Sequence, residues 1–308
     1  MTPVLWTDVA PRDGLQNVAA TVGTDAKVRL VRGLLDADAP RVEATAFVSP
    51  KWVPQLADAG EVLTELGAAA LPRLRVLIPN SRGLQLALEH GVINVLVTIG
   101  VTESFNLRNV NRSVAESLAD LDVIVATAHD AGCRVDVALS VAFGCPFEGR
   151  VDPERVLQLS RELMHRGVDE VSVADTIGVA TPSAVTSLCT QLVALAGHER
   201  AALHVHDTRG LGVANVVAAF QSGVRRFDGS VGGVGGCPFA PRSTGNVCSE
   251  DALQALISLG AHVDTDLAAL CGVAETLARD LGTDLPGKLY RAGIWSGEPA
   301  SSREERVG

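Results

Sequence analysis

Clustered basic residues and aromatic side chains are both scarce in this sequence. Only 11 of the 308 residues are aromatic (7 Phe, 3 Trp and 1 Tyr), and the formal net charge is −10. The lysines and arginines form no cluster along the chain. Proteins that bind nucleic acid or anionic membranes attract phosphate groups with basic patches. We therefore expect neither kind of partner.

Long hydrophobic runs are absent as well. No stretch reaches the roughly 18 continuous apolar residues of a membrane-spanning helix. Because the first apolar strand begins at Val4, we expect no secretory or transit leader. The six cysteines are scattered: Cys133, Cys145, Cys189, Cys237, Cys248 and Cys271. Because such usage in a long chain is typical of a reducing compartment, we expect a cytoplasmic protein without a disulfide framework.

No linker rich in Pro, Gly or Ser divides the chain, and 47% of its residues are hydrophobic, enough for one large core. Short apolar runs alternate with longer amphipathic ones. The predicted strands are Val4–Val9, Arg41–Phe47, Leu74–Ile78, Val92–Ile99, Arg134–Val141, Glu170–Ala174, Ala202–His206 and Arg226–Val231. The predicted helices are Asp25–Asp36, Ser81–His90, Val114–Ala131, Pro153–Arg166, Pro182–Ala196 and Val213–Gln221. Four helix starts carry capping signals: Thr24, Ser113 with Glu116, Asp152 before Pro153, and Thr181 before Pro182.

Eight strands alternating with helices predict an α/β protein, specifically a (β/α)8 barrel. We expect the barrel at residues 1–260 and a C-terminal helical extension and tail at residues 261–308, with a helix near Thr265–Leu281. The extension is expected to pack across the barrel or at a subunit interface. A doubly wound open sheet is the alternative, but no G-x-G-x-x-G motif follows the first strand.

The stretch AALHVHDTRGLGVAN places two histidines two residues apart. Successive side chains of a strand point to opposite faces, so His204 and His206 share one face. Two adjacent imidazoles are half of a metal site, although an H-x-H pair by itself is also compatible with two ordinary histidines. Asp207 points away from that face, and we expect it to orient a neighbour or a loop amide.

Polar residues cluster at the predicted strand ends, where the chemistry of a (β/α)8 barrel is found. A structural role, such as capping of the following helix by Asp175, can explain individual residues. It does not explain why all of them occur at strand ends. The residues in question are Arg12, Asp13 and Gln16 after the first strand, Glu43 in the second, Asp175 and Thr176 at the end of the sixth, and Cys237 and Asn246 in the glycine-rich loop after the eighth.

Four of these residues form a candidate metal-ligand set. Asp13, His204, His206 and Asn246 supply one carboxylate oxygen, two imidazole nitrogens and one amide oxygen. This mixture suits a divalent ion such as Mg²⁺ or Mn²⁺ and lacks the thiolates of a structural zinc site. Zinc or cobalt remain possible occupants, because metal choice also follows availability.

Several longer motifs extend these observations. They are PRDGLQN (11–17), EATAFVSPKWVPQ (43–55), GCPFEG (144–149), DTIGVATP (175–182), HVHDTRG (204–210) and SVGGVGGCPFA (230–240). With these motifs the chain resembles the 3-hydroxy-3-methylglutaryl-CoA lyase family of metal-dependent aldolase-like barrels, from about Val4 to about Gly260. The last motif is similar to the lyase signature and separates it from the related condensing synthases.

The resemblance implies a role for each matching residue. Asp13, His204, His206 and Asn246 correspond to the metal ligands of the family, Arg12 to its catalytic arginine and Cys237 to a cysteine on a mobile loop. Residues on further active-site motif positions are Gln16, Glu43, Asp175 and Glu250. Substrate contacts are expected from Gln16, Thr176, Ala138, Arg242 and Asn109, and contacts with CoA phosphates from Lys51, Arg108 and Arg112. A homodimer is implied as well.

The implied reaction is a retro-Claisen cleavage of a 3-hydroxyacyl-CoA into acetyl-CoA and a keto acid. The residues do not decide which group is the general base: the candidates are Asp175, a neighbouring histidine and Cys237. Ala138 stands where well-known members carry a tyrosine, and Pro241 and Arg242 depart from the family's usual loop. The alternatives are therefore a lyase for another ester, such as citramalyl-CoA or a longer branched acyl-CoA, and a non-CoA aldolase. A condensing synthase, which needs a further region, and a non-catalytic metal-binding scaffold are less consistent with the sequence.

Overall fold

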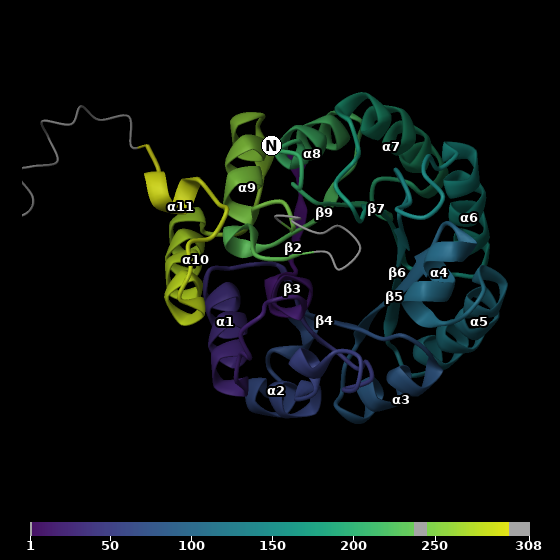
Figure 1. The fold of residues 1–308 in the computed structure, drawn as a ribbon, viewed down its shortest axis with the longest axis horizontal. Coiled ribbons are helices and arrows are strands. Elements are labelled where there is room, and N and C mark those ends of the chain that lie inside the picture. The colour runs from purple at the N-terminus through teal and green to yellow at the C-terminus, as the bar shows by residue number, and fades with distance from the viewer. Residues whose placement is uncertain (1, 237–244, 296–308) are drawn as a thin grey trace, which may run out of the picture.

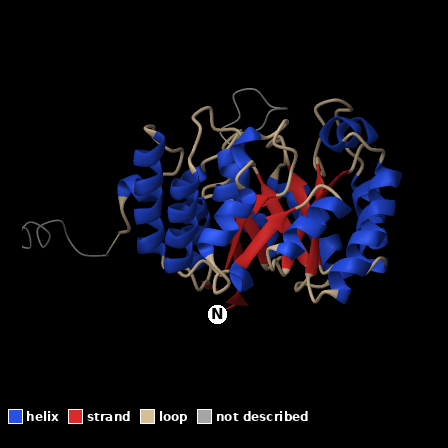
Figure 2. Ribbon diagram, turned by 90° about the horizontal axis from the view of Figure 1, so that it is seen from below, coloured by secondary structure: helices blue, strands red, loops and turns tan. Residues whose placement is uncertain are grey.

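The computed structural model describes residues 2–236 and 245–295. Eight parallel strands close into a barrel, with helices around it (Figures 1 and 2). The barrel strands are β2 (Leu5–Asp8), β3 (Arg41–Ala46), β4 (Leu74–Leu77), β5 (Asn94–Gly100), β6 (Arg134–Ser140), β7 (Glu170–Asp175), β8 (Ala201–Val205) and β9 (Arg226–Gly229). The closing pair is β2 with β9, in parallel register from Leu5↔Arg226 to Asp8↔Gly229. The predicted (β/α)8 barrel is confirmed.

The helices are α1 (Thr24–Asp36), α2 (Ala59–Leu66), α3 (Ser81–Glu89), α4 (Glu103–Val110), α5 (Val114–Asp130), α6 (Pro153–His165), α7 (Pro182–Ala196), α8 (Gly212–Gln221), α9 (Ser249–Ser258), α10 (Leu267–Leu281) and α11 (Leu289–Ala292). The predicted helices correspond to α1, α3, α5, α6, α7, α8 and α10 of the structure. Four helices were not predicted: α2, α4, α9 and α11. Both α2 and α4 are only eight residues long, shorter than the window of about 11–18 residues over which helical periodicity is judged.

Three of the four predicted caps are confirmed. Ser113 and Glu116 form a complete capping box at α5, and Asp152 and Thr181 accept backbone N–H groups at α6 and α7. The prediction for Thr24 is wrong, because Gly23 is the N-cap of α1 and no side chain caps this helix. The Thr24 hydroxyl instead donates across to the carboxylate of Asp58 at 2.8 Å.

Inward and outward residues alternate along the barrel strands, and they differ sharply in character. Outward branched residues such as Val95 and Val135 pack against the helices in one large hydrophobic core. The lumen, in contrast, holds several charged residues: Arg41, Glu43, Arg75, Asp136, Glu170 and Asp228 are all buried. Barrel interiors are more often filled by bulky apolar side chains. The ionic lumen therefore needs a specific explanation.

The C-terminal segment continues the same structure. β1 (Thr2–Pro3) pairs in parallel with β10 (Ala261–His262), and α10 packs on α1 at the side of the barrel (Figure 1). Leu270, Ala274 and Leu277 of α10 belong to the main core. A C-terminal helical segment is thus observed, while the boundary at residue 260 stays a prediction. Within residues 2–236 and 245–295, no helix is both long and apolar enough to cross a membrane.

Candidate active site

Three predicted metal ligands converge at the carboxyl ends of the strands. Asp13 lies in a single π-helical turn (Ala10–Gly14) after β2, His204 is in β8, and His206 directly follows that strand. Their donor atoms all lie within 4.8 Å of one another. The two imidazole rings have centroids 5.1 Å apart, and His206 Nε2 is 3.7 Å from Asp13 Oδ2. The expectation that both histidines share one face is confirmed.

Asn246 joins this group through backbone pairing. It forms an isolated antiparallel bridge with His206, and the neighbouring Val247 N–H donates to the carbonyl of Val205 at 3.1 Å. Its Nδ2 donates to Asp13 Oδ2 at 2.9 Å. The fourth predicted ligand is therefore brought to the other three by a segment that lies beyond β9 in the sequence.

The chemistry of these donors fits a divalent cation. Asn246 Oδ1, an acceptor, is buried and has no hydrogen-bond partner among the described residues. Buried polar atoms normally have partners, so an unpaired acceptor beside a carboxylate favours a bound ion. Burial by itself raises the pKa of Asp13, but the charge of Arg12 and the histidines outweigh it and hold that pKa well below its usual range. Asp13 is thus available as an anion.

Arg12 lies between two carboxylates next to the candidate cation site. Its Nη1 donates to Asp13 Oδ1 at 2.5 Å, and its Nε donates to Glu43. The side chain is mostly buried, with 10% of its surface exposed. A guanidinium carries several N–H donors in one fixed plane. Some of them can therefore bind the two carboxylates while others remain available to a ligand. This arrangement can stabilise negative charge that develops beside the metal ligands.

Asp175, at the end of β7, accepts hydrogen bonds from two loop amides. The N–H groups of Val179 and Ala180 donate to its oxygens at 2.8 and 2.9 Å. Burial raises its pKa above the ordinary value, in spite of these hydrogen bonds and the nearby histidines. A carboxylate with a raised pKa is better matched to proton transfer near neutral pH. Asp175 therefore anchors its own loop and remains a candidate acid or base.

Thr176 and Ala138 lie at the same mouth in different surroundings. Thr176 Oγ1 accepts the N–H of Val141 at 2.8 Å, so this hydroxyl holds the end of β6. Ala138 belongs to a small separate apolar cluster with Ala46, Leu56, Leu77 and Leu96. These four neighbours come from β3, β4, β5 and the loop after β3. Ala138 thus lies in an apolar wall within an otherwise polar mouth.

The other predicted residues are placed as follows. Gln16 is half-buried after the π-helical turn, and Asn109 is exposed on α4. Glu250, at the start of α9, accepts the N–H of Gly232. Cys237 and Arg242 lie outside the described residues.

Among the expected CoA contacts, Lys51 lies over the Trp52 ring at 5.5 Å. Arg108 lies over the Phe147 ring at 4.1 Å. Arg112 donates to Asp120 at 2.7 Å, so its charge is already paired within the chain.

Sequence reasoning missed two buried residues behind the site. Asp228 Oδ2 lies 3.5 Å from His204 Nδ1, and Arg75 contacts both Asp228 and Glu43. The available signal was a charged residue within a short apolar strand, as in LRVL of β4. Asp207 behaves as expected, because its carboxylate accepts the N–H of Gly212 at 2.6 Å.

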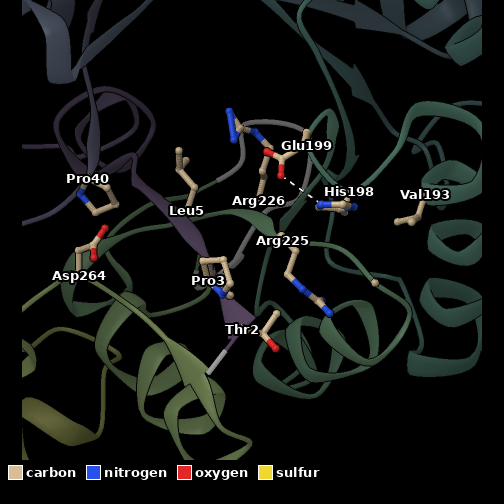
Figure 3. Close-up of a pocket in the computed structure, with 12 residues that line it drawn as sticks. Thr2, Pro3, Leu5, Pro40, Val193, His198, Glu199, Arg225, Arg226 and Asp264 are labelled. Carbon is tan, nitrogen blue, oxygen red and sulfur yellow. Dashed lines mark ion pairs between the residues drawn. The ribbon is translucent and has the colours of Figure 1, made fainter.

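A cavity of about 540 Å³ opens at the opposite, amino-terminal end of the barrel (Figure 3). Thr2, Leu5, Arg225 and Arg226 line it, and none of the candidate ligands does. Active sites of barrel enzymes lie at the carboxyl end of the strands. The chemistry is therefore assigned to the mouth that holds Asp13 and the histidines, and these features define a (β/α)8-barrel enzyme.

Comparisons with known proteins agree with this class. The HMGL-like family model matches residues 3–277. The chain is 40% identical over 275 residues to the mitochondrial hydroxymethylglutaryl-CoA lyase of Arabidopsis thaliana, covering 89% of this chain but 59% of that protein. It is 39% identical over 303 residues to the (R)-citramalyl-CoA lyase of Chloroflexus aurantiacus, covering 95% and 96% of the two chains.

A solved structure shows the same relationship. The HMG-CoA lyase from Acinetobacter baumannii, in complex with coenzyme A and 3-methylmalate, has a TM-score of 0.91 and 35% identity, covering 96% of this chain and 97% of that one. The chain belongs to the HMGL-like family and is a carbon–carbon lyase.

Proposed function

We propose that this enzyme cleaves a 3-hydroxy-3-methylglutaryl-CoA-type ester to acetyl-CoA and acetoacetate, with a divalent metal ion. The observation that carries the proposal is the position of Arg12, which donates to Asp13, a member of the candidate metal-ligand set. A permanent cation beside such a site suits a reaction in which negative charge develops on a thioester oxygen. The named lyase relatives support the same chemistry.

The reaction breaks the bond between C2 and C3 of the substrate. The C3 hydroxyl loses its proton, its oxygen becomes the new ketone, and the C2–C3 electron pair moves into the thioester as an enolate, which is then protonated at C2. Held by Asp13, His204, His206 and Asn246, a divalent ion would supply Lewis-acid stabilisation of negative charge on the substrate's oxygens.

The chain's own residues then have defined tasks. Arg12 binds the thioester oxygen as its charge grows, and Glu43 keeps the guanidinium in place. The hydroxyl proton needs a base, for which we propose Asp175, with its raised pKa, or a neighbouring histidine. Cys237 remains a candidate for proton exchange at C2, on the basis of the family resemblance alone.

A second substrate class deserves equal testing. The small side chain of Ala138 sits in the apolar cluster with Leu56, Leu77 and Leu96. An apolar wall beside a polar site fits an acyl group with a larger or differently placed hydrocarbon substituent. Separately, the similarity to a citramalyl-CoA lyase is consistent with another 3-hydroxyacyl-CoA as the substrate.

Several further points are part of the proposal. We infer that Mg²⁺ or Mn²⁺ is the preferred ion, because the ligands combine oxygen and imidazole donors without thiolate. Gln16, Thr176, Asn109 and Arg242 are proposed to contact the substrate or its CoA moiety. We also propose a homodimer and a cytoplasmic location. The five described cysteines, which are all free, support the location.

The test is acetyl-CoA release by the purified protein with Mg²⁺ or Mn²⁺, and again with a chelator. The substrates are 3-hydroxy-3-methylglutaryl-CoA, citramalyl-CoA and a longer branched 3-hydroxyacyl-CoA. Chelator-sensitive cleavage of the methylglutaryl ester is expected. Cleavage of only another ester would retain the mechanism and reassign the substrate, whereas no cleavage of any ester would refute the proposed function.

A further inference from the structure

Arg75 is, with Glu43, one of the two charged residues of the ionic lumen that are fully buried. It lies on β4 between Leu74 and Val76, and its exposed fraction is 0%. Its guanidinium donates hydrogen bonds to two carboxylates from different strands. Nε donates to Glu43 Oε2 at 2.7 Å, and Nη2 donates to Asp228 Oδ2 at 3.0 Å.

Each of these carboxylates has a second partner in the active site. Glu43 uses its other oxygen, Oε1, to accept from Arg12. Asp228 lies 3.5 Å from Nδ1 of His204, which leaves Nε2 of that ring for a metal ion. Through these two carboxylates, the guanidinium of Arg75 is linked both to Arg12 and to His204.

We propose that Arg75 is a positioning residue that fixes Arg12 through Glu43 and His204 through Asp228. The planar fork of an arginine holds two carboxylates at a set separation, which a flexible ammonium group cannot do. Groups that orient a metal-ligating histidine commonly affect metal affinity or activity by 10- to 100-fold. Arg75 thus couples the metal site to the oxyanion site without touching substrate.

The lumen also provides a matched control. Arg41 is buried as well, and it donates to Thr7, Asp136 and Glu170 at 2.8 to 3.0 Å. None of these three partners belongs to the candidate site. Glu170 also accepts a hydrogen bond from Arg226, which lines the cavity at the amino-terminal end of the barrel (Figure 3). Arg75 Nη1 also lies 3.6 Å from Glu170 and 3.9 Å from Asp136, so the two arginines share these neighbours, but only Arg75 donates hydrogen bonds to Glu43 and Asp228.

The experiment compares Arg75→Lys with Arg41→Lys in the full-length protein. Mn²⁺ binding is titrated by electron paramagnetic resonance, which also reports the spectrum of the bound ion. For Arg75→Lys we expect the Kd for Mn²⁺ to rise 10- to 100-fold, the spectrum to change, and kcat to fall at least 10-fold. For Arg41→Lys we expect Kd and kcat within threefold of wild type.

Two results would overturn the proposal: Arg75→Lys within threefold of wild type in both Kd and kcat, or the same losses in Arg41→Lys, which would indicate a general weakening of the barrel. If Arg75→Lys does not fold, Asp228→Asn tests the link between the buried charges and His204. Unchanged Mn²⁺ affinity and spectrum in that variant would contradict the role of Asp228 as the link to His204.

The turnover measurement rests on the proposed function, whereas the Mn²⁺ measurement does not. A wild-type protein that binds Mn²⁺ but cleaves no ester in the panel would refute the proposed function. The effect of Arg75→Lys on Mn²⁺ binding would still test the positioning role.

Discussion

Arg12 is the residue whose surroundings relate most directly to chemistry. It is held by Glu43 on one side and by Asp13 on the other. Such a charge is already oriented before substrate arrives, so little reorganisation is needed when negative charge develops. Its effect should therefore be on turnover more than on metal binding.

We predict that Arg12→Gln lowers kcat by about 10²- to 10³-fold, the usual cost of removing one preorganised donor to a developing oxyanion. Mn²⁺ affinity should stay within a fewfold of wild type, because Asp13, His204 and His206 are retained. Steady-state kinetics and Mn²⁺ titration measure the two quantities. Arg29→Gln, at an exposed ion pair between α1 and α10, is the control and should leave both unchanged. Near-normal turnover in Arg12→Gln would remove this residue from the mechanism.

Among the elements, the junction of β6 and β7 shows how the mouth is shaped. Val141, directly after β6, has φ of +57°, a conformation that is strained for a β-branched residue. Its N–H donates to the hydroxyl of Thr176, directly after β7. Two neighbouring strand ends are thus tied together beside the apolar wall of Ala138 and Leu77.

We predict that Thr176→Val lowers the free energy of unfolding by about 1–3 kcal/mol, because the buried N–H of Val141 loses its acceptor. Thr176→Ser keeps the hydroxyl and should stay close to wild type in stability and in KM. Urea unfolding and steady-state kinetics check both variants. If Thr176→Val also raises KM while Thr176→Ser does not, the hydroxyl of Thr176 contacts substrate directly, as proposed above.

At the scale of the whole molecule, a buried hydrogen-bond chain joins the first and last parts of the barrel. Ser249, at the start of α9, donates to Asp8 Oδ2 at 2.6 Å and accepts from Trp6 Nε1 at 3.0 Å. Asp8 is 1% exposed. Burial, with a smaller contribution from the charge of Glu250, raises the pKa of Asp8 to about 7.

This raised pKa predicts a pH-dependent stability. Folded Asp8 holds its proton up to about pH 7, whereas the unfolded chain loses it near pH 4, so the free energy of unfolding falls as pH rises through this window. Between pH 5 and 8 we expect wild type to lose about 2–3 kcal/mol relative to Asp8→Asn, which does not titrate. Urea unfolding at the two pH values measures the difference. Asp284→Asn, at an exposed position, should follow wild type, and parallel pH profiles for wild type and Asp8→Asn would contradict the prediction.

Hydrophobic periodicity was sufficient for the barrel, because each strand and each long helix buries its own apolar face. It was insufficient for α2 and α4, which are short, and for the start of α1, where Thr24 bonds to Asp58 across a loop. Local patterns cannot reveal such a partner. The H-x-H spacing was enough to place His204 and His206 on one face, since strand geometry alone decides that.

The sequence by itself therefore determined the fold class, the strand ends that form the mouth, and the donor types available there. Only the tertiary structure decided which buried charges support the site. Arg75 and Asp228 are 153 residues apart and meet at 3.0 Å across the lumen. Closing the sheet brings inward side chains of distant strands together whatever their separation along the chain. Their partners depend on barrel register, a long-range property that no local pattern of residues contains.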